Sequence, residues 1–153
     1  MPNVITRYPH LEINGVPLAT PAWEASDLNS LLQGPDQRGS DRLLPGASGV
    51  RPYKRRATVS KRSVRLVIFG DYDREGVAYA DPFAGLVANI DYLRLNVSDP
   101  TGTGDGTRTA ILRLSAVSAK TGSVHVEGLE LSDDDPPTVR AVLMLSLPTG
   151  ALV

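Results

Sequence analysis

The segment 138-TVRAVLMLSL-147 decides the fold, because every second residue from Val139 to Leu147 is apolar. Alternation with a period of two indicates a β-strand with one buried face. The apolar positions on that face are Val139, Ala141, Leu143, Leu145 and Leu147. A strand this apolar is expected to lie centrally in a sheet, so the rest of the chain must supply strands on both sides of it.

Other strand-like runs surround this one. Thr107–Val117 and Ser123–Leu131 precede it, and Lys120–Gly122 and Asp133–Pro137 have the composition of turns. Ala57–Phe69 predicts one strand or two, with Val64, Leu66 and Ile68 on one face and Arg65, Val67 and Phe69 on the other. The last three strands therefore predict an antiparallel meander.

Residues 81–96 carry the clearest helix signal. Asp81 can cap the helix, and Pro82 suits its first position because proline has no N–H to leave unpaired there. Apolar residues then follow at spacings of three and four, which predicts one buried stripe: Phe83, Leu86, Val87, Ile90 and Leu93. Strands, one helix and a closing meander predict a mainly β domain, a sandwich or barrel with one helix against it.

The first part of the chain predicts smaller elements. Val4–Ile13 is an irregular strand, Asn14-Gly15 is a strong hairpin-turn signal, and Val16–Leu18 returns as an edge strand because it contains proline. Thr20–Leu32 is interpreted as a short helix, in which Trp23 has a packing role.

Residues 34–56, GPDQRGSDRLLPGASGVRPYKRR, lie between these parts, and their apolar residues recur with no steady period. A connection of this length is unusual inside a compact domain and indicates a binding arm, a cover over an active site, or disorder. We interpret it as an extended arm inserted into a single domain that spans residues 1–153.

Composition limits the functional classes. The chain has 153 residues, a formal net charge of −1 and no cysteine, which excludes disulfides, thiolate metal sites and a cysteine nucleophile. Met1-Pro2-Asn3 does not begin a signal peptide, and no apolar run reaches the roughly 20 residues of a spanning helix. We expect a soluble protein made in a cytoplasm, without membrane insertion.

No set of residues predicts catalysis. Asp71 to Gly76 loosely resembles the start of a calcium loop, but Pro82 occupies the position of its bidentate glutamate, so a turn with aspartates bonded to nearby backbone is favoured. The glycine-rich run 102–106 precedes a strand rather than a helix, which favours a turn over a phosphate site. His10 and His125 have no spaced metal-binding partner. We expect no enzyme activity, metal or cofactor.

Charge is segregated along the sequence. Residues 51–65 contain seven basic residues and no acid, namely Arg51, Lys54, Arg55, Arg56, Lys61, Arg62 and Arg65. Residues 127–135 contain five acids and no base, namely Glu127, Glu130, Asp133, Asp134 and Asp135. Three interpretations remain open: two solvated surfaces, a nucleic-acid-binding module on the basic strip 51–65, or head-to-tail assembly in which a basic face meets an acidic one.

Two segments resemble a known family. The opening Tyr8 to Leu18 and the segment Gly34 to Val50 resemble minor tail proteins of long-tailed actinobacterial phages. The glycine and proline spacing from Arg38 to Pro52 is similar to the N-terminal part of phage distal tail proteins. The resemblance covers residues 5–95.

The resemblance implies a fold of the tail-tube type and a structural virion subunit that assembles, in the host cytoplasm, as a homohexameric ring at the distal end of a phage tail. Its implied partners are copies of itself, the tail-tube protein, the tape-measure protein and the tail-tip hub proteins, with DNA passing through the channel. A tube or connector subunit of the same fold is the alternative. The expected subunit interface comprises Arg38, Asp41, Arg42, Leu43, Leu44, Arg51, Tyr53, Arg55, Arg56, Glu130, Asp133 and Asp134.

Overall fold

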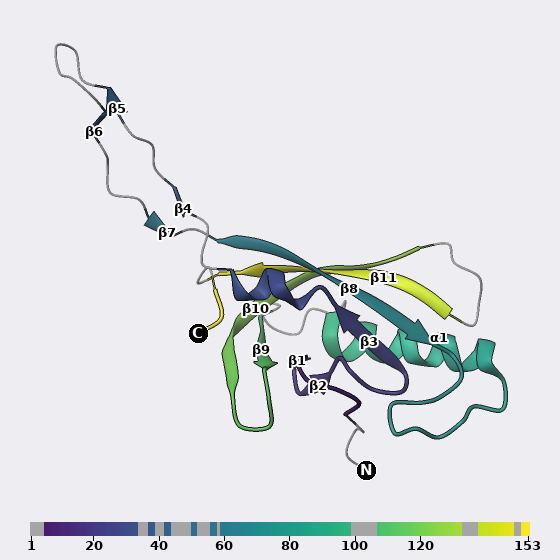
Figure 1. Cartoon of the computed structure of the whole chain (residues 1–153). Coiled ribbons are helices and arrows are strands. Elements are labelled where there is room, and N and C mark those ends of the chain that lie inside the picture. The colour runs from purple at the N-terminus through teal and green to yellow at the C-terminus, as the bar shows by residue number, and fades with distance from the viewer. Residues whose placement is uncertain are drawn as a thin grey trace.

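The computed structural model describes residues 5–33, 37–38, 42–43, 50–51, 56–57, 59–98, 107–132, 138–148 and 151–153. Seven strands form one antiparallel sheet in the order β2-β1-β9-β10-β11-β8-β3 (Figure 1). Their bounds are β1 His10–Ile13, β2 Val16–Pro17, β3 Trp23–Ser26, β8 Ser60–Phe69, β9 Thr107–Arg113, β10 Ala119–Leu131 and β11 Thr138–Leu147. The protein is thus mainly β, as predicted.

The segment with the clearest alternation is strand β11, and it lies inside the sheet. It pairs along its full length with β8, from Thr138 opposite Phe69 to Leu147 opposite Ser60, and on its other side with β10. All five apolar residues predicted for its inner face are buried. The prediction of a central strand is confirmed. Of the one or two strands predicted for 57–69, β8 covers Ser60–Phe69, and Ala57 belongs to a separate short strand, β7 (Arg56–Ala57).

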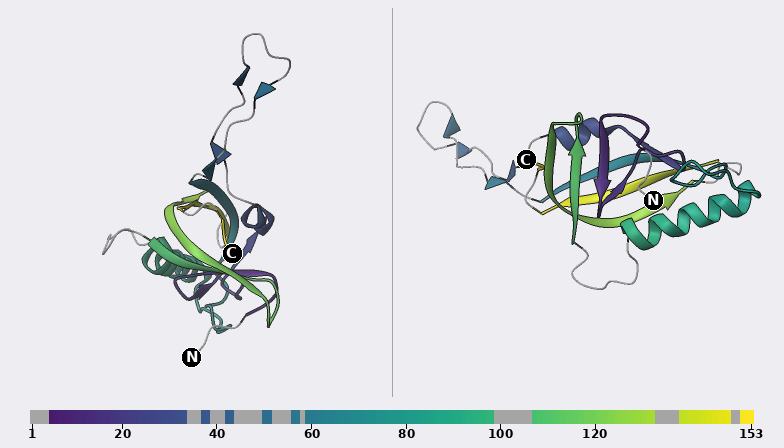
Figure 2. Two further views of the ribbon diagram at one scale, coloured as in Figure 1. Left: turned by 90° about the vertical axis from the view of Figure 1, so that its left-hand side faces the viewer. Right: turned by 90° about the horizontal axis from the view of Figure 1, so that it is seen from below.

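The sheet curls because the two halves of β10 pair with different neighbouring strands. Its first half pairs with β9 and its second half with β11, and a bulge lies between Val126 and Gly128. A bulge bends the strand that carries it, and Figure 2 shows β10 curving from one direction to the other. The strands therefore form a half-barrel around one core, where a sandwich of two sheets was one of the expected arrangements.

The two ends of the curled sheet meet at Leu18. Its backbone N–H donates to the carbonyl of Leu11 on β1 at 2.7 Å, and its own carbonyl accepts from the N–H of Ala25 on β3 at 2.8 Å. An edge with unpaired backbone groups invites pairing with other chains. At this position the chain satisfies part of both edges internally.

One α-helix, α1 (Pro82–Leu93), packs against the inner face of the sheet and continues as a short π-helical turn, Arg94–Ser98 (Figure 1). The Asp81 carboxylate caps it by accepting from the N–H of Phe83 at 3.0 Å, so the predicted start is confirmed. The predicted stripe is partly wrong, since Phe83 and Val87 are 59% and 47% exposed. The buried side is Gly85, Leu86, Asn89, Ile90 and Leu93.

The first segment departs from one prediction. Asn14 and Gly15 have φ of 53° and 78°, which confirms the predicted turn. The expected helix at 20–32 is wrong: Trp23–Ser26 forms β3, and only Leu28–Leu32 is helical, as a 3₁₀ turn. Trp23 and Ala25 are both buried, a strand period that the loose helical spacing of leucines obscured. Trp23 does have the predicted packing role.

The hairpin between β9 and β10 turns earlier than predicted. Lys120–Gly122 lies within β10, and the turn is at residues 114–118, where Leu114 and Ser115 donate to the carbonyl of Ser118. The Ser115 hydroxyl also accepts from the N–H groups of Val117 and Ser118. Serine side chains that bond local backbone favour turns, and this outweighed the glycine at 122. The expected turns at 102–106 and 133–137 lie outside the described residues.

Candidate assembly surfaces

The predicted arm contains paired strands. β4 (Gln37–Arg38) pairs with β7, and β5 (Arg42–Leu43) pairs with β6 (Val50–Arg51), all antiparallel. Figures 1 and 2 show these strands beyond the end of β8, away from the sheet and helix. Within the described residues, these four strands pair only with one another. The pair β5–β6 lies between β4 and β7 in the sequence, so the two described pairs are nested as in one hairpin, which we call the hairpin arm.

The predicted interface residues are placed unequally. Arg38, Arg42, Leu43, Arg51 and Arg56 lie on the four paired strands of the hairpin. Glu130 lies near the end of β10 and is exposed. The others, Asp41, Leu44, Tyr53, Arg55, Asp133 and Asp134, lie outside the described residues. The structure thus brings five of the predicted residues onto one hairpin.

The described part of the basic strip lies beside acids of the same chain. Lys61 Nζ is 3.7 Å from Glu127 Oε1, and Arg65 Nε is 3.2 Å from Asp27 Oδ2. The Lys61 and Arg65 side chains are about three-quarters exposed, at 76% and 77%. Exposed ion pairs contribute at most about 1 kcal/mol. Charges that are segregated in the sequence are therefore partly interleaved on the folded sheet, and these pairs can exchange partners.

The outer face of the sheet contains a hollow of about 560 Å³. The ladder register places Ser26, Arg65, Val142 and Glu130 in one row across four strands. The neighbouring row brings together Glu24, Val67, Arg140 and Ser132, whose N–H donates to the Arg140 carbonyl. Val67 and Val142 form its floor together with the adjoining backbone. We call this the outer hollow; it combines an apolar floor with charged walls.

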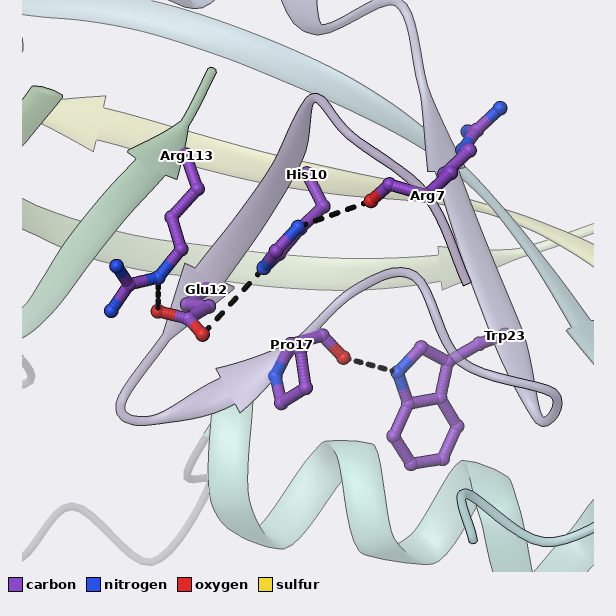
Figure 3. Close-up of polar contacts among 6 residues, drawn as sticks. All are labelled: Arg7, His10, Glu12, Pro17, Trp23 and Arg113. Carbon is purple, nitrogen blue, oxygen red and sulfur yellow. Dashed lines mark hydrogen bonds and ion pairs between the residues drawn. The ribbon is translucent and has the colours of Figure 1, made fainter. Parts of the chain in front are cut away.

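A buried histidine lies on the opposite edge of the sheet (Figure 3). His10 Nδ1 is 3.1 Å from the Arg7 carbonyl, and its Nε2 is 3.6 Å from Glu12 Oε1. Arg113 Nε donates to the other Glu12 oxygen at 2.8 Å. His10 is only 1% exposed, so no reactant can reach its ring. The group fastens the N-terminal segment to β1 and β9, aided by a hydrogen bond from the Arg7 guanidinium to the Ala25 carbonyl.

The loop that resembled a calcium site is held by local hydrogen bonds. Asp73 Oδ1 accepts from the N–H groups of Glu75 and Val77, both at 2.9 Å, which is the turn favoured from the sequence. The Asn89 amide of α1 donates to the carbonyls of Phe69 and Tyr72 and accepts from the Tyr79 hydroxyl. Burial, and then the Asp73 carboxylate, raise the pKa of Tyr79 above 10.0, against an opposing effect of Arg74. The loop is thereby attached to the helix.

In the part of the chain that the structure describes, no three His, Cys, Asp or Glu side chains gather as metal ligands. No described helix is long and apolar enough to cross a membrane. No protein-family model matches the chain, and no curated protein is significantly similar to it.

Sequence reasoning missed the outer hollow and the contacts of His10. A spacing of two in a strand does place His10 and Glu12 on one face, which is a usable signal. Their partner Arg113 comes from a strand that is distant in the sequence, and nothing local marks it. The same holds for the hollow, which exists only once the strands are in register.

Proposed function

We propose that this protein is a structural subunit of a phage tail that assembles with copies of itself into a ring, with six subunits as the expected number. We place the ring at the distal end of the tail, between the tube and the tip proteins. A tube or connector position for the same subunit is the alternative. The protein has no enzymatic role in this proposal, and no cofactor.

The hairpin arm is the observation that carries the proposal. Strands β4–β7 satisfy one another's backbone groups and add nothing to the seven-stranded sheet. A long hairpin that contributes no described backbone pairing to the domain needs another reason to exist, and reaching a neighbouring subunit supplies one. The segment also carries the sequence resemblance, from Arg38 to Pro52.

The basic residues of the arm are the proposed anchors. Arg55 and Arg56 would lie against acids of the next subunit, where complementary charge sets register and speeds encounter. The acidic segment 127–135 is the proposed counterpart, of which Glu127 and Glu130 lie on the second half of β10. Acidic residues would also suit a channel that passes DNA, because they do not hold phosphates.

The test is the mass and shape of the purified protein. Native mass spectrometry and negative-stain imaging are expected to give a sixfold ring. Replacing Arg55 and Arg56 together by Glu should abolish the ring, whereas replacing both by Lys should preserve it because charge is retained. Rings that survive the double charge reversal would contradict the role of the arm, and a monomer at all concentrations would contradict self-assembly.

Nucleic-acid binding by the strip 51–65 is the competing function. Two of its residues, Lys61 and Arg65, already have acidic neighbours in the same chain, which weakens attraction for phosphates. DNA binding by the monomer that falls steeply with added salt would favour this function over the structural one.

A further inference from the structure

Helix α1 is apolar on its outer side as well as on its buried side. Its outward residues Phe83, Val87 and the following Leu95 are 59%, 47% and 61% exposed, and Ala84 and Ala88 lie between them. Among the exposed residues of 82–95, only Asp91 and Arg94 are charged. A surface helix normally presents polar residues to water, and a helix that is apolar all round is normally covered all round. The outer side of α1 therefore has the composition of a contact surface.

The outer hollow has the matching composition on the other side of the sheet. Leu86, Ile90 and Leu93 of α1 share the core with Val64, Leu66 and Ile68 of β8. Residues of β8 alternate between faces, so Arg65 and Val67 point away from the helix. Val67 and Val142 are only half-buried there, and Met144, two residues along β11, is 37% exposed. One face of the sheet is covered by a helix, and on the other face the described part of the chain leaves Val67, Val142 and Met144 partly exposed.

Both surfaces carry charges of both signs, since Arg65, Arg140 and Glu130 line the hollow and Asp91 and Arg94 lie on the outer side of the helix. The helix presents one acid, Asp91, and one base, Arg94, about one turn apart. The row across the hollow runs from Arg65 through Val142 to Glu130, so a base and an acid flank an apolar centre two strands apart, about 10 Å. The Arg65–Asp27 pair is exposed on both sides, at 77% and 60%, and can give way to Asp91.

We infer that the outer side of α1 of one copy docks into the outer hollow of the next copy. Helix and hollow lie on opposite faces of one sheet, so the contact joins two different surfaces and is repeated head to tail. Such a contact closes into a ring or extends as a filament, and it does not stop at a dimer. Each sheet would then lie between its own helix and its neighbour's. The inference rests on the proposed function only in taking a second copy as the occupant.

Mixing two variants tests the direction of this contact. Val87→Arg places an unpaired charge on the helix side, and Val142→Arg places one on the hollow side. Each variant alone should lose self-association, by at least about a hundredfold in apparent affinity, because an unpaired charge is costly to bury. An equimolar mixture should form only one-to-one dimers, since one intact helix meets one intact hollow. Sedimentation and native mass spectrometry measure the masses.

Val117→Arg is the matched control, because this valine is 97% exposed in the turn before β10, and this variant should assemble like the parent protein. Circular dichroism checks that every variant is folded, and Val67→Arg replaces Val142→Arg if the latter does not fold. A mixture that stays monomeric, single variants that assemble normally, or a parent protein that is monomeric up to about 100 μM would overturn the inference.

The outcomes separate this inference from the proposed function. Rings that survive Val87→Arg but not the charge reversal at Arg55 and Arg56 would overturn the helix contact and keep the tail role. Filaments or mixed dimers without rings would support the helix contact and count against the ring.

Discussion

At the scale of single residues, Asn89 is a polar residue on the buried side of helix α1. It is 3% exposed, and its three side-chain hydrogen bonds all go to the 69–79 segment rather than to its own helix. Gly85, one turn earlier, leaves room for the Tyr79 ring, because a Cβ there would lie 2.3 Å from a ring carbon. These two residues let a polar loop lie directly on α1.

Removing the Asn89 amide should destabilise the protein strongly. Asn89→Ala removes three partly buried hydrogen bonds, to the Phe69 and Tyr72 carbonyls and from the Tyr79 hydroxyl, and we expect a loss of about 2–3 kcal/mol. Tyr79→Phe removes a single bond and should cost about 1 kcal/mol. Urea unfolding of both variants measures the difference. Equal losses for the two variants would show that the carbonyl contacts of Asn89 contribute nothing.

Tyr79 should also make stability depend on alkaline pH. Its pKa is raised in the folded protein, chiefly by burial, so its ionisation opposes folding. The contribution of protonated Tyr79 to the free energy of unfolding is fully present below pH 10.0, the pKa of the unfolded chain. It is lost as the pH rises through the higher pKa of the folded protein. Unfolding free energy measured from about pH 9 to about pH 11 should fall less in Tyr79→Phe than in the parent protein. Identical slopes would contradict the assignment.

Residue-level prediction succeeded where the cause was local. The Asp81 cap and the Asn14-Gly15 turn depend on neighbours within a few positions. The Asn89 carbonyl contact spans 20 residues, and the Glu12–Arg113 pair spans 101. Pairings at that range follow from strand register, which no motif in the sequence states.

At the scale of elements, α1 depends on its first turn. The Asp81 carboxylate accepts from the Phe83 N–H, and Pro82 occupies the first helical position. Asp81→Ala should therefore cost about 1 kcal/mol in unfolding free energy, and Asp81→Ser should restore most of it. Thermal unfolding of the three proteins measures this. A Ser variant no better than Ala would mean that the carboxylate acts through charge on the helix end rather than by capping.

The hairpin arm should be dispensable for folding. Its described strands pair only among themselves, so replacing residues 34–58 by a glycine–serine linker of about eight residues removes no ladder from the main sheet. We expect stability to change by about 1 kcal/mol or less, because shortening a loop has a small entropic effect. Calorimetry should show one cooperative transition near that of the parent protein. A broad or missing transition would show that the arm belongs to the folding unit.

Two elements were misread for the same reason. Trp23–Ser26 was assigned to a helix, and Phe83 and Val87 were assigned to a buried stripe. In each case apolar residues lie at spacings that fit more than one face or period. Pairing with β8 determines that Trp23–Ser26 is a strand, and the position of the sheet determines which side of the helix is buried. Strongly periodic segments such as β11 do not have this ambiguity.

At the scale of the whole molecule, the curvature of the sheet is the property that could not be predicted from the sequence. The spacing of apolar residues in the sequence predicts a mainly β structure with one helix. Whether the strands form one sheet or two depends on the bulge in β10 and on the hydrogen bonds of Leu18. The bulge is an irregularity within β10, and Leu18 is a single residue just after β2. They turn a meander and an N-terminal hairpin into one continuous half-barrel, and Figure 2 shows the arm at one end of it.

The chain has one tryptophan, so folding can be followed by its fluorescence. Trp23 is fully buried, its indole N–H donates to the Pro17 carbonyl at 2.9 Å (Figure 3), and its ring stacks on Tyr92, over which the Arg74 guanidinium lies. Its emission should be shifted to the blue in the folded protein and move to the red on unfolding. Because the indole is remote from solvent, dilution that separates subunits should leave the emission unchanged. A red shift on dilution alone would mean that subunits unfold as they part.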